Sequence, residues 1–188
     1  AVFGLEVDNV YIEMNNIEPP ILDGSSKQFI NKILEVGIKE LDSKRKYIKI
    51  LEPIEYHDEN HGINIKITPA NNFSVTYKAD FPYKSIGKQT YELNSLSDYG
   101  SNVGSARTFC SFNELEYLKN NGLIKGANSN CGVVFFNKKN NLDDIKKINS
   151  EYNLDIHLDN NKNKSNVKLR YDNEPARHKV LDLVGDFS

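Results

Sequence analysis

Apolar residues recur at helical spacing in several parts of the chain, and they predict four helices. The clearest pattern covers residues 27–41, where the apolar positions fall on one face of an amphipathic helix. A terminal helix is expected over residues 173–188, because Pro175 is tolerated in the first turn of a helix. Shorter helices are expected at residues 113–119 and 142–148.

Other segments have the alternation or the short apolar runs that are typical of strands. The expected strands are residues 7–14, 47–56, 62–68, 73–81, 88–93 and 131–136. Residues 57–62 are expected to form the turn of a hairpin between two of them. Residues 137–166 are rich in Asn, Lys and Asp and are interpreted as a polar insertion. The mixture of elements predicts an α+β fold, with a charged linker at residues 42–46 as the domain boundary.

Composition narrows the class of protein. The chain has 188 residues and 38% hydrophobic residues, which is enough for a modest core. Lys and Arg number 24 against 26 Asp and Glu, so the charge balance has no signature of nucleic-acid binding. Two cysteines are too few for a disulfide framework and indicate free thiols in the cytoplasm. No apolar run is long enough for a membrane span, and the apolar start without methionine indicates an excerpt of a longer protein.

The last eleven residues carry the clearest chemical pattern. His178, Asp182 and Asp186 follow one another at four-residue intervals, so they share one face of the terminal helix. One imidazole nitrogen and one carboxylate oxygen on such a face can hold a cation such as zinc. The plainer alternative is an ordinary hydrogen-bonded pair on a surface helix, and spacing alone favours that alternative.

Two other groups of residues are candidate sites. His57 and His61 are also four apart, but the turn expected around them predicts surface residues rather than two aligned metal ligands. Thr108, next to Arg107, can polarise a carbonyl or stabilise an oxyanion. The alternative there is a strand-to-helix junction with Thr108 as a cap and Arg107 in a surface ion pair. Cys110 is interpreted as a buried structural thiol.

The string Arg-His-Lys-Val-Leu-Asp-Leu-Val-Gly-Asp at residues 177–186 closely resembles the zinc-binding helix of the UDP-3-O-acyl-N-acetylglucosamine deacetylases (LpxC). Ala-Arg-Thr-Phe at 106–109 and Pro-Ile-Leu-Asp-Gly-Ser at 20–25 are similar to two further motifs of that family, in the same order. The resemblance implies two similar α+β domains, each a sheet packed with helices. Residues 1–45 would be the end of an incomplete first domain, and residues 46–188 the second.

The resemblance also implies an activity. The family consists of zinc amidases that remove the N-acetyl group from UDP-3-O-(3-hydroxyacyl)-N-acetylglucosamine, the committing step of lipid A synthesis. The implied cofactor is Zn²⁺, and the implied partner is this UDP-linked acylated glucosamine. A cytoplasmic monomer without a nucleic-acid partner or membrane span is expected.

Specific roles follow from the matched positions. By resemblance, His178 and Asp182 are zinc ligands, Thr108 stabilises the oxyanion, and Asp186 orients a catalytic histidine. Lys179 and Phe109 match residues that contact the substrate. Four further residues are expected to line a passage for the acyl chain: Leu115, Gly126, Cys131 and Val134. Asp23 is expected to have a mainly structural role in its turn.

The chain departs from the family pattern in ways that keep alternatives open. The family's first zinc histidine and its glutamate base match no residue here and belong upstream, and its catalytic histidine belongs downstream. Pro175-Ala176 replaces an acidic residue with bulky apolar neighbours. Three hypotheses therefore remain: a zinc deacetylase that needs flanking segments, a non-catalytic remnant of the same fold, and an unrelated α+β domain whose last helix carries ion pairs.

Overall fold

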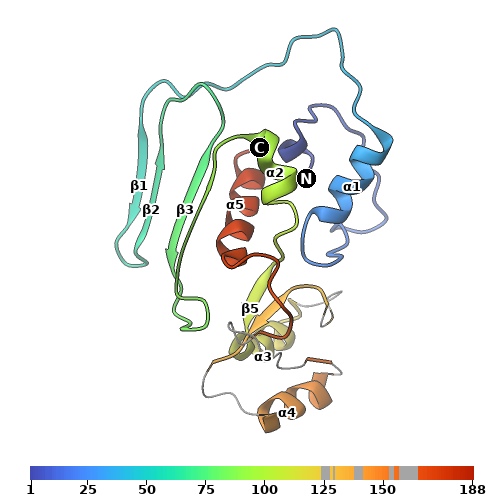
Figure 1. Ribbon diagram of the computed structural model, residues 1–188, viewed down its shortest axis with the longest axis vertical. Helices are drawn as coiled ribbons and strands as arrows, with labels where there is room; N and C mark the ends of the chain where they lie inside the picture. Colours follow the sequence, from blue (N-terminus) through green and yellow to red (C-terminus); the bar gives the residue numbers. More distant parts are fainter. Residues whose placement is uncertain (124–127, 129, 138–141, 153–154, 157–164) are drawn as a thin grey trace.

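The computed structural model describes residues 1–188 except 124–127, 129, 138–141, 153–154 and 157–164, and the fold of the described residues is α+β (Figure 1). Their helices are α1 (Lys27–Val36), α2 (Tyr99–Asn102), α3 (Phe112–Asn120), α4 (Leu142–Tyr152) and α5 (Glu174–Asp186). Their strands are β1 (Ile54–Asp58), β2 (Ile63–Ile67), β3 (Val75–Asp80), β4 (Lys88–Leu93), β5 (Phe109–Ser111) and β6 (Val133–Phe135). Short 3₁₀ turns lie at Phe3–Leu5 and Leu96–Asp98.

Helix α5 lies between the β3–β4 hairpin and the segment that carries α1 and α2 (Figure 1). Val180 and Val184 are four residues apart, so they share the face of α5 that packs inward. They join one apolar cluster with Ile30, Leu93, Tyr99 and Val103. Burial of this face holds α5 in place, because fully burying one such side chain contributes roughly 1.5–3 kcal/mol.

A second apolar cluster lies around the parallel pair of β5 and β6, which α3 connects. Phe109 pairs with Val133 and Ser111 with Phe135, and a parallel pair of this kind needs a crossover element. The cluster comprises Phe112, Leu115, Val134, Phe136, Ile145, Ile148 and Ile156. Helix α4, which lies in the expected polar insertion, therefore adds apolar side chains to this core.

The turn at residues 20–25 docks against the segment that precedes β5. Gly24 has φ +78°, and a Cβ atom there would meet the Cys131 carbonyl oxygen at 2.5 Å, so glycine is required by both conformation and space. Its own carbonyl accepts a hydrogen bond from the Thr108 amide at 2.7 Å. Asp23 binds Ser25 and Arg170, which agrees with the structural role expected for it. Burial acts to raise the pKa of Asp23, but the hydrogen bonds from Arg170 and Ser25 together lower it.

Much of the secondary structure predicted from the sequence is confirmed. Strand β4 occupies the predicted residues, and β3, β6, α3 and α5 differ from prediction by one to a few residues at their ends. Pro175 lies in the first turn of α5 as expected. Both cysteines are free thiols.

Other predictions need correction. The strand expected at residues 7–14 is not formed, because no described segment pairs with it and a lone strand leaves its backbone groups without partners. The first helix ends at Val36 rather than at residue 41, because the next residue, Gly37, has φ +89° and breaks the helical backbone. Strand β1 begins at Ile54 rather than at residue 47, and it includes His57, which was expected in the turn. Helix α4 runs to Tyr152, beyond the predicted end.

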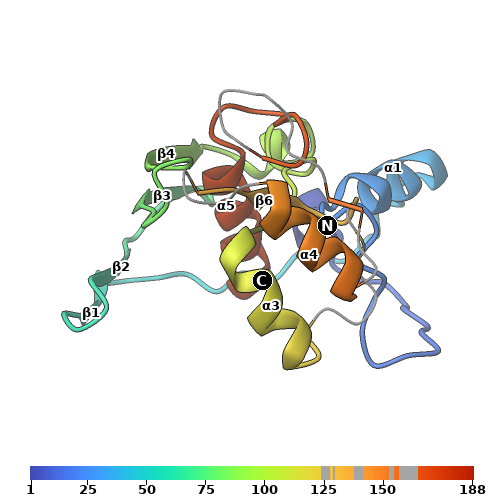
Figure 2. The same ribbon diagram turned by 90° about the horizontal axis from the view of Figure 1, so that it is seen from below.

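The β1–β2 hairpin lies on the opposite side of α5 from α1 in both views (Figures 1 and 2). Its antiparallel register pairs Ile54 with Ile67 and Asp58 with Ile63. The side chains of Ile54, Tyr56 and Ile63 remain exposed. Among the described residues, no helix combines the length and apolar character needed to cross a membrane.

Candidate functional site

His178 is buried on α5, with only 7% of its surface exposed, and its ring stands edge-on to Phe109 at 6.4 Å between centroids. Its Nδ1 lies 2.9 Å from the carbonyl oxygen of Ala106. A carbonyl oxygen only accepts hydrogen bonds, so Nδ1 carries the proton and donates. Burial lowers the pKa of His178 by more than Asp182 and the Ala106 carbonyl raise it. The ring is therefore neutral near pH 7, and Nε2 has a free lone pair.

Asp182 faces this lone pair from one helical turn further on. Its Oδ1 lies 3.4 Å from His178 Nε2, and its Oδ2 accepts a hydrogen bond from Lys179 Nζ at 3.0 Å. A carboxylate oxygen and an unprotonated nitrogen are both acceptors, so neither can satisfy the other by a hydrogen bond. A shared cation would satisfy both, and this donor pair suits zinc. No group of three such donors occurs in the part of the chain that the structure describes.

The segment at residues 106–109 packs against His178. Phe109 contacts Phe81 and Phe135 at 5.5 and 6.1 Å between ring centroids, and the Lys179 ammonium lies 5.7 Å from its ring. The backbone of Thr108 is held on both sides, by the Gly24 carbonyl and by the Val133 amide. The structure thus brings Phe109 against His178 and Lys179, a contact that spacing in the sequence could not show.

Asp186 lies at the exposed end of α5. An open hollow of about 460 Å³ runs beside this end of the helix. Its lining includes two of the three carboxylates of the helix and the start of the chain: Ala1, Phe3, Gly4, Tyr99, Leu181, Asp182, Val184, Gly185 and Asp186. Asp186 thus shares a solvent-accessible surface with Asp182, one turn away from His178.

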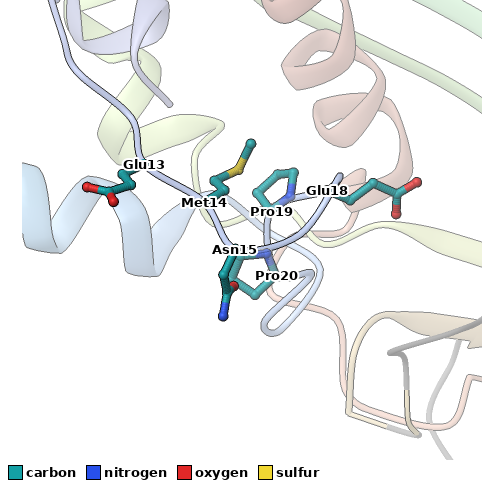
Figure 3. A pocket seen from close by; sticks show the side chains of 6 residues that line it. All are labelled: Glu13, Met14, Asn15, Glu18, Pro19 and Pro20. Atoms are coloured by element: carbon teal, nitrogen blue, oxygen red, sulfur yellow. The ribbon is translucent and has the colours of Figure 1, made fainter.

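A second hollow, of about 360 Å³, is formed by residues 13–20 alone (Figure 3). Its side chains are Glu13, Met14, Asn15, Glu18, Pro19 and Pro20. None of these belongs to the candidate site, and one short segment of chain forms the whole lining. The hollow therefore adds no chemistry to the site at α5.

Three of the four residues expected to line an acyl-chain passage lie near β5 and β6. Leu115 and Val134 are buried in the apolar cluster of that region, and Cys131 is buried where Gly24 approaches its backbone. Gly126 lies outside the described residues. Their role in a passage stays a prediction.

The rival residues differ in environment. His61 Nδ1 lies 2.8 Å from Asp58 Oδ2, and His57 Nε2 lies 3.3 Å from Glu55 Oε2, all on the surface of the hairpin. His157 lies outside the described residues. Cys110 was expected to be buried but is only partly buried, packed against the apolar cluster around β5 and β6. Desolvation, with a smaller contribution from Glu114, raises the pKa of its thiol to about 12, which disfavours the reactive thiolate.

One residue of the site has no signal in the sequence pattern. Glu174 accepts hydrogen bonds from Arg107 Nε at 2.8 Å and from the Arg107 amide at 3.0 Å. Arg107 therefore forms a buried ion pair, not the surface pair considered as an alternative. The two residues lie 67 positions apart, and no spacing rule connects them.

Comparison with known proteins gives one consistent result. Residues 1–154 match the profile of the family described as LpxC, UDP-3-O-acyl N-acetylglycosamine deacetylase. The whole chain is 35% identical to part of a bifunctional enzyme LpxC/FabZ of Chlorobaculum tepidum and covers 41% of that protein. It is 34% and 33% identical to UDP-3-O-acyl-N-acetylglucosamine deacetylases of Nitratidesulfovibrio vulgaris and Aliarcobacter butzleri, covering 53% and 55% of them. The chain thus spans about half the length of these relatives, and α5 lies beyond the part that the profile matches.

Proposed function

Because the chain belongs to the UDP-3-O-acyl N-acetylglycosamine deacetylase family, LpxC, we propose that it forms part of a zinc-dependent amide hydrolase. The proposed reaction removes the N-acetyl group from UDP-3-O-(3-hydroxyacyl)-N-acetylglucosamine, in the cytoplasm. Membership of this family excludes the hypothesis of an unrelated α+β domain. The proposal also includes a monomer with two domains that meet near residues 42–46.

The observation that carries the proposal is the pair formed by His178 and Asp182. Nδ1 of the imidazole is occupied by the Ala106 carbonyl, and Nε2 faces a carboxylate oxygen at 3.4 Å. The ring nitrogen of a metal-binding histidine that does not bind the metal usually donates its N–H to a carboxylate, a backbone carbonyl or water, which fixes the tautomer and the ring orientation. The Ala106 carbonyl has this position beside His178 Nδ1. His178 and Asp182 therefore fit two of the three protein ligands of a catalytic zinc site.

Each remaining residue of the site has a role in this proposal. Zinc, when bound, lowers the pKa of a water molecule so that it can attack an amide near neutral pH. Thr108 donates a hydrogen bond to the oxyanion that develops on the substrate. Phe109 and Lys179 flank the reacting group, and Asp186 orients a histidine supplied from outside this chain.

The acyl chain is proposed to contact Leu115, Gly126, Cys131 and Val134, the residues that the family resemblance assigns to its passage. This placement is chemically reasonable because each buried methylene contributes about 0.8 kcal/mol. The described residues near His178 supply two metal donors rather than three. A non-catalytic remnant of the same fold is therefore kept as the second candidate. In the enzyme, the third donor and the carboxylate base come from a segment outside this chain.

The first experiment measures zinc affinity of the 188-residue chain by competition with a chelating dye. We expect weak binding that His178→Ala weakens by more than the roughly 10–100-fold that loss of an outer-shell partner costs. His61→Ala is the matched control and should bind zinc as the unchanged chain does. Equal affinity of the unchanged chain and His178→Ala would contradict the metal role of α5.

A second experiment separates the enzyme from the remnant. The chain is placed between the flanking segments of the Nitratidesulfovibrio vulgaris relative, of which it covers 53%. Release of acetate from the UDP-linked substrate, lost in Asp182→Ala, is the expected result for the enzyme. A folded, zinc-loaded chimera that releases no acetate would favour the remnant.

A further inference from the structure

Glu174 occupies the first position of α5, and its side chain is almost fully buried, with 1% exposed. Its Oε1 accepts hydrogen bonds from the amide and Nε of Arg107, at 3.0 and 2.8 Å. Its Oε2 accepts from Nη2 of Arg107 at 3.1 Å and from the Arg170 amide at 2.7 Å. A carboxylate offers about four lone-pair positions, so this carboxylate is fully engaged.

The amide of Arg107 belongs to the same peptide group as the carbonyl of Ala106. A trans peptide is planar, and its N–H and C=O point in opposite directions. Glu174 holds the N–H end of this peptide, and His178 Nδ1 donates to the C=O end. Glu174 and His178 are four residues apart on α5, so side chains from one helical turn form hydrogen bonds with both the N–H and the C=O of a single peptide group.

Resting on the proposed zinc site, we propose that Glu174, together with Arg107, is a positioning residue for His178. By fixing the peptide between Ala106 and Arg107, Glu174 keeps the carbonyl aimed at Nδ1. The proton then stays on Nδ1, and the lone pair of Nε2 stays directed toward Asp182. Arg107 contributes by donating two side-chain hydrogen bonds to the Glu174 carboxylate. Its Nη2 also donates to the Lys168 carbonyl at 2.8 Å.

This role differs from a purely structural one in what it affects. A structural ion pair would change the unfolding of the chain and leave the tautomer of His178 alone in the folded state. A positioning residue changes the tautomer while the fold persists. The tautomer is visible without metal and without catalysis, in the ¹⁵N shifts of the imidazole.

The test uses Glu174→Gln in the full 188-residue chain, labelled with ¹⁵N-histidine and free of metal. Long-range ¹H–¹⁵N spectra of the unchanged chain should show His178 protonated on Nδ1. Glu174→Gln should show a mixture of both tautomers, because an amide cannot accept all four hydrogen bonds. Its zinc affinity should fall about 10–100-fold, the usual effect of losing an outer-shell partner.

Glu114→Gln is the matched control. Glu114 lies in the first turn of α3, and its Oε2 accepts a hydrogen bond from the Ser111 amide at 2.7 Å, at the end of the same β5 strand. This control makes the same chemical change at a helix start that does not touch the peptide at Ala106. It should keep the tautomer and the zinc affinity of the unchanged chain.

An unchanged tautomer in folded Glu174→Gln would overturn the positioning role, and so would an equal effect in Glu114→Gln. If Glu174→Gln does not fold, Glu174→Asp decides, since its shorter side chain cannot span both backbone amides and should also mix the tautomers. Failure of the unchanged chain to bind zinc would count against the proposed function alone. The tautomer measurement would still decide whether Glu174 positions His178.

Discussion

The chain places histidines beside carboxylates in two regions, the β1–β2 hairpin and helix α5, and the surroundings differ. On the hairpin, His61 is 73% exposed and its partner Asp58 is the last residue of β1, three positions earlier. On α5, His178 is buried against Phe109, and its second nitrogen is bound by the Ala106 carbonyl. A histidine and an aspartate three residues apart therefore form a solvated surface pair on the hairpin, whereas a histidine and an aspartate four residues apart form an oriented pair with a buried imidazole on α5.

The difference shows that spacing in the sequence identifies candidate metal-binding histidines. The group that contacts the other ring nitrogen distinguishes between these candidates. A metal site needs a ligand whose tautomer and orientation are set by an outer-shell partner. His178 has such a partner on a different segment of chain, and that segment is itself held by Glu174. The Nδ1 of His61 faces Asp58, three residues earlier on the same hairpin.

The largest expected effect is on stability, from breaking the ion pair behind α5. Arg107→Ala leaves the buried Glu174 carboxylate without its charged partner and should lower the free energy of unfolding by about 3–5 kcal/mol. The hairpin counterpart is Lys66→Ala, which removes an exposed pair with Glu55 and should leave the urea midpoint within error of the unchanged chain. Equal midpoints for the two variants would remove the distinction between the regions.

The next effect is a pH dependence that comes from α5. Burial lowers the pKa of His178 below its ordinary value of 6.5, so the unfolded chain takes up this proton more readily than the folded chain. The stability contributed by neutral His178 is complete above pH 6.5 and is lost as the pH falls through the lowered folded value.

Urea unfolding of metal-free protein between pH 7.5 and 5 should therefore show a loss of stability on acidification, with the pH range chosen around the ordinary histidine pKa of about 6.5. His178→Gln should flatten this slope, because glutamine does not titrate. An unchanged slope in His178→Gln would show that other groups account for the acid sensitivity.

The smallest effect is expected on the hairpin. His61→Asn removes an exposed side chain whose ion pair lies in solvent, and such pairs contribute little. Its urea midpoint should match that of the unchanged chain. A clear loss of stability or of zinc affinity would give the hairpin a role that its geometry does not indicate.

Local pattern was sufficient for much of the fold and for part of the site. The positions of β4 and of the central part of α5 could be predicted from side-chain periodicity and from Pro175, because these signals depend on residues close together in the sequence. The common face of His178, Asp182 and Asp186 follows from helix geometry in the same way. Prediction failed at residues 7–14, because alternation indicates a strand only when another strand supplies hydrogen bonds.

Long-range contacts explain what pattern could not reach. Arg107 and Glu174 are separated by 67 positions, and Ala106 and His178 by 72, so no periodicity relates them. Their meeting depends on α5 packing its apolar face against the core while residues 106–109 dock on the turn at Gly24. The sequence alone determined the residue types and their spacing along one helix. The tertiary structure decided the burial of His178 and the partner of its Nδ1, because these depend on segments that come together only on folding.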